Sequence, residues 1–587
     1  MTQNVEPHIA LSDEVILDVK GLKTQFPTRT GLVKAVDDVS FQLRHGKTTC
    51  IVGESGSGKS ITARSILQIL DPPGEIVAGT IRLITPPRAG GRSGIVDLTA
   101  LPARSRAIRA IRGRDIAMIF QEPMSSLSPV HTIGDQIIET IRLHEAVSNQ
   151  QARERSIELL RRTEIEHPET AIDRYTFEFS GGMRQRAMIA MALSCNPQVL
   201  IADEPTTALD VTTQAEILDL MRELQKSYGM ALMFITHDMG VVAEIADDVV
   251  VMRHGKVVEN NTVEALFSAP QHAYTKRLLN SVIKLENRAA QKLPEATLLG
   301  QLAEPVLDIR NVSIDFALPR KLFRRAPPPF RAVDKVSFTL YRGESLGIVG
   351  ESGSGKTTLG RAIASVFAPT HGSISYGSGP DNTTSLARMR GAELAQYRRR
   401  VRMIFQDPYG SLNPRMTVGQ IIAEPLINNS ALATKSLQDR VAELLHQVGL
   451  PADIIERYPH AFSGGQRQRI SIARAIALTP EIIICDEATS ALDVSIRSQV
   501  LDLLIELQES LDLSFIFISH DIGVVRYFCD RVAVMRQGKI VELGAASRVC
   551  SSPEHPYTQA LLSAIPNPDP TRRKIHLRQR YAGEDTR

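Results

Sequence analysis

The stretch GESGSGKS occupies residues 53–60, and GESGSGKT repeats it at residues 350–357. Both contain a glycine, four residues, a second glycine, a lysine and then a serine or threonine, which is the pattern of a phosphate-binding loop. Each stretch follows a short apolar run and precedes a helical pattern, as a loop between a buried strand and a helix requires. Backbone N–H groups and the helix N-terminus then surround the phosphates. A chance glycine-rich turn is the alternative, and two matches in the same context argue against it.

In such a loop the lysine reaches the outer phosphates, and the hydroxyl that follows it binds Mg²⁺. These residues are Lys59 and Ser60 in the first stretch, and Lys356 and Thr357 in the second. The remaining loop residues, which are expected to contact the phosphates, are Gly53, Glu54, Ser55, Gly56, Ser57, Gly58 and Ile61 in the first stretch and Gly350, Glu351, Ser352, Gly353, Ser354, Gly355 and Thr358 in the second.

The repeat extends well beyond these loops. VDDVSFQLRHGK at 36–47 recurs as VDKVSFTLYRGE at 333–344, and FSGGMRQR at 179–186 recurs as FSGGQRQR at 462–469. The first copy carries an insertion, which we assign to a Pro/Gly/Arg-rich loop at 86–94. We therefore expect two complete domains, residues 14–283 and 306–567, joined by a linker at 284–305 and followed by a polar basic tail at 568–587.

Each half alternates short apolar runs with amphipathic stretches. Val199–Ala202 and Leu232–Ile235 are apolar throughout, whereas Gln214–Gln225 has a helical pattern. This alternation predicts an α/β fold with a mostly parallel sheet, and the uniformly apolar runs predict central strands that are buried on both faces.

Composition excludes several classes of protein. The 587 residues carry 68 Lys and Arg against 65 Asp and Glu, a formal net charge of +3, which disfavours nucleic acid as the main partner. The acidic N-terminus and the lack of long apolar runs predict neither a secretion signal nor a membrane span. Five cysteines without a CxxC pair predict a reducing compartment with no zinc site or disulfide framework.

An apolar run that ends in Asp-Glu follows each loop, at VLIADE (199–204) and IIICDE (482–487). The aspartates are expected in the Mg²⁺ shell, and the glutamates are expected to orient or deprotonate the attacking water. A later apolar run in each half ends in a histidine that can contact the γ-phosphate, although an isolated histidine is more often structural. The resulting Mg²⁺ ligands are Asp203 and Asp486, and the catalytic candidates are Glu204, His237, Glu487 and His520.

Together these motifs resemble the ATP-binding cassette (ABC) ATPases, over about residues 14–283 and 306–567. The resemblance implies two tandem P-loop NTPase domains, each with a RecA-like α/β core, a helical subdomain and an antiparallel β subdomain. It implies ATP and Mg²⁺ as cofactors, with Gln121 and Gln406 as Mg²⁺-binding residues that sense the transporter. It also assigns the ATP-binding signature to Ser180, Gly181, Gly182, Ser463, Gly464 and Gly465, and the loop at the dimer interface to Asp210 and Asp493.

Each ATP site is expected to pair the loop of one half with the signature of the other, so that Lys59 works with Ser463 and Lys356 works with Ser180. The first signature has Met183 where the second has Gln466. Because both halves keep the catalytic glutamate and histidine, we expect two working sites.

The resemblance places an adenine-stacking aromatic at Phe26 and at Phe316. Phe330 competes with Phe316, because PRKLFRRAPPPFR (319–331) interrupts the second copy. A phenylalanine in a strand is more often a core residue, and this alternative stays open. The basic run Lys321 to Arg325 is interpreted as a solvated face, with contact to anionic lipid or phosphate as the alternative.

HAYTKRLL (272–279) and HPYTQALLSAIPNP (555–568) resemble the C-terminal segments of dipeptide and oligopeptide importer ATPases, in their fused two-cassette form. This resemblance implies an ATP-hydrolysing subunit that energises import of peptides or related small solutes, on the cytoplasmic side of the bacterial inner membrane. The implied partners are two integral-membrane permease subunits, docked beside Gln121 and Gln406, and a periplasmic solute-binding protein. No nucleic acid is expected, and no iron–sulfur cluster, because neither tail carries four cysteines. The alternative is a soluble double-cassette ATPase that acts on ribosomes or DNA.

Overall fold

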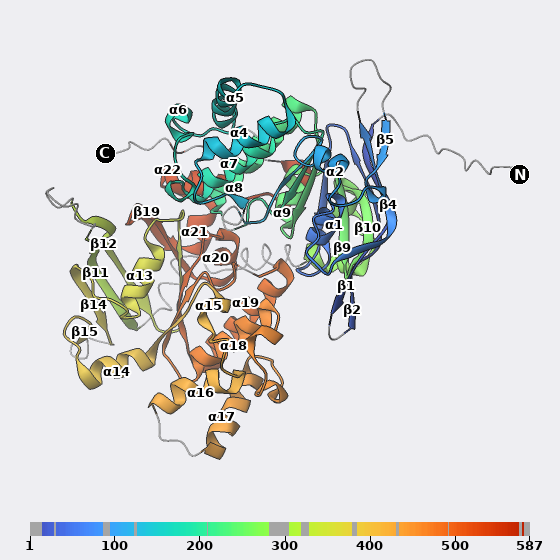
Figure 1. Ribbon diagram of the computed structural model, residues 1–587. Helices are drawn as coiled ribbons and strands as arrows, with labels where there is room; N and C mark the ends of the chain where they lie inside the picture. The colour runs from blue at the N-terminus through green and yellow to red at the C-terminus, as the bar shows by residue number, and fades with distance from the viewer. Residues whose placement is uncertain are drawn as a thin grey trace, which may run out of the picture. The chain divides into compact units, whose positions relative to one another are not determined.

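The computed structural model describes residues 14–28, 31–85, 94–122, 126–207, 209–280, 304–317, 328–377, 384–429, 434–490, 492–573, 578–579 and 581. The chain forms two compact units (Figure 1). The first contains Met1–Leu209, Thr213–Asn280 and Pro566–His576, and the second contains the rest. Most of the predicted linker, all but the last residue of the predicted insertion loop at 86–94, and the basic run Lys321 to Arg325 lie outside the described residues.

The core of the first unit is a six-stranded sheet with the order β10-β9-β3-β8-β7-β6. Neighbouring strands are parallel except for β10, which pairs antiparallel with β9. Every residue of β3, β7 and β8 is buried, as the uniformly apolar runs predict. The bounds are β3 (Thr48–Val52), β6 (Ile116–Ile119), β7 (Val199–Asp203), β8 (Ala231–Thr236), β9 (Asp248–Arg253) and β10 (Lys256–Thr262).

A four-stranded antiparallel sheet with the order β2-β1-β4-β5 forms a second layer of this unit. Helix α1 (Lys59–Ile66) contacts β1 and β2 of this sheet and β7 of the core sheet, so the phosphate-loop helix lies between the two layers. Buried apolar residues of both sheets and of α1 form one hydrophobic cluster. The bounds are β1 (Val15–Thr28), β2 (Gly31–Arg44), β4 (Glu75–Thr85) and β5 (Gly94–Asp97).

A group of helices lies between β6 and β7 along the chain and apart from the antiparallel sheet (Figure 1). These are α4 (Ile133–His144), α5 (Asn149–Arg162), α6 (Pro168–Ala171) and α7 (Gly181–Ala192). Thr132 and Ser148 start α4 and α5 with capping boxes, which satisfy the first free N–H groups of each helix. The helices of this unit also include α2 (Arg106–Ile111), α8 (Val211–Tyr228), α9 (Met239–Ile245) and α10 (Val263–Ser268).

The second unit repeats this plan, with sheets β16-β17-β18-β13-β19-β20 and β12-β11-β14-β15. Its strands are β11 (Pro305–Phe316), β12 (Phe330–Tyr341), β13 (Ser345–Val349), β14 (His371–Tyr376), β15 (Thr384–Ser385), β16 (Val401–Ile404), β17 (Ile482–Asp486), β18 (Ser514–Ile518), β19 (Arg531–Arg536) and β20 (Lys539–Ala545). Its helices are α13 (Lys356–Ile363), α14 (Gly391–Arg400), α15 (Pro408–Ser411), α16 (Val418–Asn429), α17 (Thr434–Gln447), α18 (Gly464–Ile476), α19 (Val494–Leu511), α20 (Ile522–Phe528), α21 (Ala546–Ser551) and α22 (Pro556–Ser563). The predicted fold class, two α/β domains with helical and antiparallel β subdomains, is confirmed.

The segment that starts at Pro566 belongs to the first unit by its contacts. The Asn567 N–H donates to Glu244 Oε1 at 3.2 Å, and Arg573 Nη2 donates to the Ala246 carbonyl at 2.6 Å, both at the end of α9. Within the described ranges, no helix combines the length and apolarity that a membrane crossing requires.

Candidate functional site

Each phosphate loop connects a central strand to a helix, β3 to α1 in the first unit and β13 to α13 in the second. Gly58 and Gly355 adopt φ values of +100° and +98° directly before the helix. A Cβ atom on Gly58 would lie 2.4 Å from the Ala35 carbonyl, and one on Gly355 would lie 2.3 Å from the Ala332 carbonyl. Only glycine fits this turn and this close approach.

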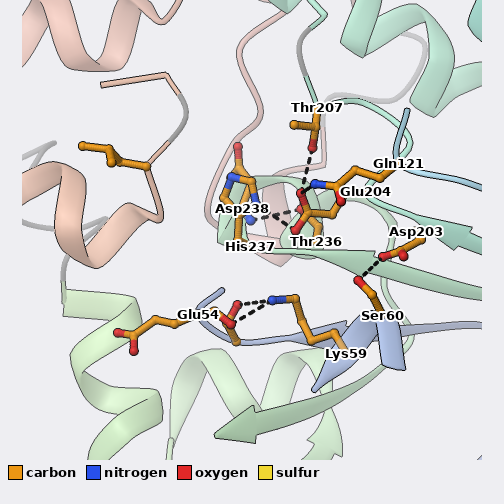
Figure 2. A network of polar contacts seen from close by, with 12 residues as sticks. Glu54, Lys59, Ser60, Gln121, Asp203, Glu204, Thr207, Thr236, His237 and Asp238 are labelled. Atoms are coloured by element: carbon orange, nitrogen blue, oxygen red, sulfur yellow. Dashed lines mark hydrogen bonds and ion pairs between the residues drawn. The ribbon is translucent and has the colours of Figure 1, made fainter. Parts of the chain in front are cut away.

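The two loop lysines fold back over their own loops. Lys59 Nζ donates to the carbonyls of Gly53 at 2.7 Å and Glu54 at 3.0 Å (Figure 2). Lys356 Nζ donates to the corresponding carbonyls of Gly350 and Glu351, both at 2.7 Å. Burial lowers the pKa of Lys356, although surrounding carboxylates oppose this effect. Each loop thus holds one buried lysine through its own backbone carbonyls.

The hydroxyl after each lysine meets the predicted aspartate. Ser60 Oγ donates to Asp203 Oδ1 at 2.9 Å, and Thr357 Oγ1 donates to Asp486 Oδ1 at 2.8 Å. Burial raises the pKa of both aspartates, and these hydrogen bonds offset part of the effect. A hydroxyl and a carboxylate held together supply the hard oxygen ligands that Mg²⁺ prefers.

The glutamate next to the aspartate is the centre of a polar network in the first unit (Figure 2). Gln121 Nε2 and Thr207 Oγ1 each donate to Glu204 Oε2 at 3.0 Å, and His237 Nδ1 lies 3.3 Å from Glu204 Oε1. Burial acts to raise the pKa of Glu204, but the hydrogen bond and charge of His237 and the charge of Lys59 outweigh it, so this pKa lies below its usual value. The network holds a buried carboxylate in its ionised form, as a general base requires.

The second unit repeats the glutamine and histidine contacts, whereas Ser490, at the position of Thr207, donates to the Glu487 backbone carbonyl at 2.9 Å. Gln406 Nε2 donates to Glu487 Oε2 at 2.7 Å, and His520 Nδ1 lies 3.2 Å from Glu487 Oε1. The pKa of Glu487 is lowered for the same reasons, with His520 and Lys356 outweighing burial. Glu204 and Glu487 also share an unusual backbone conformation, with φ values of 45° and 47°. Non-glycine residues held in this region are often found at functional sites.

The two signatures start helices α7 and α18. Ser180 Oγ accepts the Met183 N–H at 3.3 Å, and Ser463 Oγ accepts the Gln466 N–H at 3.4 Å. A Cβ atom on Gly182 would lie 2.7 Å from Thr213 Cγ2. The helix N-termini are suited to anions, and the pairing of each signature with a phosphate loop stays a prediction.

The proposed adenine-stacking residues lie on the antiparallel sheets. The Phe26 ring packs on Gly74, where an added Cβ would lie 2.4 Å from Phe26 Cε1. Phe316 is 43% exposed and Phe330 is 55% exposed, and they face each other in the register of β11 and β12. Phe316 makes an edge contact with Phe367, with ring centroids 5.8 Å apart. The choice between Phe316 and Phe330 stays open.

Two site residues were missed by the sequence reasoning, which used the HAYT and HPYT segments only to assign a class. Tyr274 Oη accepts the Glu54 N–H at 2.9 Å, and Tyr557 Oη accepts the Glu351 N–H at 3.2 Å. The available signal was that both tyrosines recur at equivalent positions after their loops, as the other site residues do.

Comparison with known families shows which family the chain belongs to. Residues 36–207 and 333–490 match the family model described as ABC transporter, and residues 258–303 and 541–585 match the model described as oligopeptide/dipeptide transporter, C-terminal region. The chain therefore belongs to the ABC transporter family, and it is an ATPase. The predicted family and activity are confirmed, and the ribosome or DNA alternative is not favoured.

The chain is similar along almost its whole length to named importer components. It is 47% identical over 589 residues to the glutathione import ATP-binding protein GsiA of Escherichia coli (strain K12), covering 97% of this chain and 92% of the relative. It is 45% identical over 585 residues to GsiA of Pectobacterium atrosepticum, with the same two shares. Among solved structures, a dimeric ATP-binding cassette bound to ADP and Pi is 28% identical, covering 41% of this chain and 98% of that chain with a TM-score of 0.36.

Proposed function

We propose that this chain is the ATP-hydrolysing subunit of a bacterial importer for peptides or related small solutes such as glutathione. The observation that carries the proposal is the presence of two complete glutamate–histidine–glutamine networks, each followed by a peptide-transporter C-terminal segment. The names of the GsiA relatives support glutathione as one candidate solute.

In this proposal each phosphate loop binds the ATP phosphates through its N–H groups and its lysine. Glu204 and Glu487 accept a proton from the attacking water, and His237 and His520 contact the γ-phosphate beside them. Mg²⁺ fits the oxygen groups at each loop and would be held by Ser60, Asp203 and Gln121 in the first site and by Thr357, Asp486 and Gln406 in the second. When bound, it neutralises charge on the phosphates.

The proposed sites are composite, with Lys59 paired with Ser463 and Lys356 paired with Ser180, and with Asp210 and Asp493 at the interface. Cysteines placed at 59 and 463 test this pairing by crosslinking in ATP-trapped protein. Efficient crosslinking only between positions 59 and 180 would contradict it.

The proposed partners are two permease subunits, which contact the helical subdomains beside Gln121 and Gln406, and a periplasmic solute-binding protein. The chain would then be peripheral to the cytoplasmic face of the inner membrane. ATP binding closes the two cassettes and hydrolysis releases them, a population shift driven by the shared ligand.

Reconstitution tests this proposal. The chain is combined with its permease in liposomes, and uptake of labelled glutathione and dipeptides is measured in the presence of ATP and the binding protein. We expect uptake that requires ATP and is lost in the Glu204→Gln, Glu487→Gln variant. Sedimentation with ribosomes, without association with permease-containing membranes, would support the alternative function instead.

A further inference from the structure

The HAYT and HPYT segments place a tyrosine hydroxyl against each phosphate loop. The bonded N–H groups belong to Glu54 and Glu351, the second residue of each loop. The carbonyls of the same two residues accept the loop lysines at 3.0 Å and 2.7 Å. The loop lysine and the tyrosine thus hold the same residue from two sides.

In the first unit, a buried glutamate holds the segment that carries the tyrosine in place through hydrogen bonds. The Glu259 carboxylate accepts the N–H groups of Gln271 at 2.9 Å and His272 at 3.0 Å, and His272 Nδ1 accepts the Tyr274 N–H at 3.1 Å. The hydrogen bonds to Glu259 outweigh its burial and lower its pKa. The position of the tyrosine therefore depends on a chain of charged and polar contacts that starts at strand β10.

The second unit repeats this chain of contacts. The Glu542 carboxylate accepts the N–H groups of Glu554 at 3.0 Å and His555 at 3.1 Å, and His555 Nδ1 accepts the Tyr557 N–H at 3.1 Å. The two units share this arrangement down to the accepting atoms. The contact between the tyrosine and the loop is therefore a supported part of both sites.

The tyrosine rings are also fixed. Tyr274 and Tyr557 are each 2% exposed. The guanidinium of Arg253 lies 5.1 Å from the Tyr274 ring centroid, and that of Arg536 lies 5.4 Å from the Tyr557 ring centroid, within cation–π range. Burial raises the pKa of Tyr557, which keeps its hydroxyl protonated.

We propose that Tyr274 and Tyr557 are positioning residues that hold the start of each phosphate loop in its phosphate-binding shape. Each loop lysine is shared with the phosphates once ATP is bound, whereas the tyrosine hydroxyl accepts a backbone N–H of the loop. The hydrogen bond from the loop N–H to the tyrosine hydroxyl therefore persists through the ATPase cycle. This inference rests on the proposed role of the loops in ATP binding.

The test removes only the two hydroxyls, in a Tyr274→Phe, Tyr557→Phe variant of the full chain. ATP affinity is measured in a Glu204→Gln, Glu487→Gln background, and KM and kcat are measured in the otherwise native chain. We expect about 2- to 10-fold weaker ATP binding, the usual effect of one lost hydrogen bond, and a matching rise in KM with kcat within about twofold. Hydrogen exchange at the Glu54 and Glu351 amides rises as well.

Tyr527→Phe is the matched control, because Tyr527 is 1% exposed and its hydroxyl contacts Asp502 instead of a loop. We expect the control, which removes one hydroxyl, to lower the melting temperature while its ATP affinity stays native. Native ATP affinity in the double variant, or equal weakening in the control, would overturn the positioning role. A Lys59→Ala, Lys356→Ala variant separates the two proposals. Native ATP binding in that variant would show that the loops themselves are misassigned.

Discussion

The two cassettes differ in many residues but agree closely around their predicted ATP sites. The hydroxyl-to-aspartate hydrogen bond is 2.9 Å in the first and 2.8 Å in the second, and the histidine-to-glutamate distance is 3.3 Å and 3.2 Å. Supporting contacts diverge more. Because the glutamine, glutamate and histidine contacts are present in both, neither site lacks one of the predicted catalytic groups.

An exchanged charge pair illustrates the divergence. In the first cassette Lys47 Nζ lies 3.4 Å from Asp247 Oδ1 in a largely exposed pair. At the position of Lys47, the second cassette has Glu344, whose Oε1 lies 3.0 Å from Arg531 Nη1 in a buried pair. The charge at this position thus changes sign and becomes buried, and its partner Arg531 occupies the position of Asp248 in the strand register, one residue after Asp247. The neighbouring strands β3 and β13 keep their buried patterns.

The largest expected effect comes from disabling both networks together. The Glu204→Gln, Glu487→Gln variant keeps the shape and hydrogen bonding of each site but has no group to accept the water's proton. We expect turnover to fall by about 10²-fold or more while ATP binding is retained. Steady-state phosphate release and nucleotide retention measure the two effects. Near-native hydrolysis would show that these glutamates are not the bases.

Glu344, at the position of Lys47 in the first cassette, gives the second cassette a pH-dependent stability. Burial raises the pKa of Glu344 from 4.5 to about 7, even though Arg531 lies beside it. The folded state then holds the proton more tightly than the unfolded state, so the stability from this group is full below pH 4.5 and is lost as pH rises to about 7. We expect a loss of up to ~3 kcal/mol over this window.

Glu344→Gln should flatten this pH dependence, because glutamine does not titrate. Melting curves between pH 5 and 8 measure it, and Lys47→Met in the first cassette is the control for removing the equivalent charge. An unchanged slope in Glu344→Gln would show that Glu344 titrates normally.

The smallest expected effect concerns the signature helices. Gln466 Oε1 accepts the Ser463 N–H at 3.1 Å and completes a capping box, which Met183 does not provide at the start of α7. Met183→Gln should stabilise the first cassette and Gln466→Met should destabilise the second, each by about 0.5–1 kcal/mol. Melting temperatures that move together in one direction would contradict the capping account.

Much of this structure was predictable because the informative signals are local. The loop that carries Lys59 and Ser60 follows strand β3, and Asp203 ends strand β7, so sequence context placed them at one edge of the sheet. Helix ends were harder to predict. The pattern at Gln214–Gln225 indicated a helix but not where it ends, because the terminal turns of a helix carry little periodicity. In the structure α8 runs from Val211 to Tyr228.

Long-range contacts were not predictable from these patterns. Tyr274 is 220 residues from Glu54 along the chain, and Glu344 is 187 residues from Arg531. Nothing in the spacing of such residues reveals which of them meet. The recurrence of the tyrosines in both halves was the only local hint of their role.

The central claim, that both cassettes hydrolyse ATP with equivalent networks, is tested most directly by comparing Glu204→Gln with Glu487→Gln as single variants in the full chain. ATP turnover is measured for both under identical conditions. The account predicts that each substitution lowers turnover severely and to a similar extent. A near-native rate in one variant, beside a severe loss in the other, would contradict it and would show that only one site is catalytic.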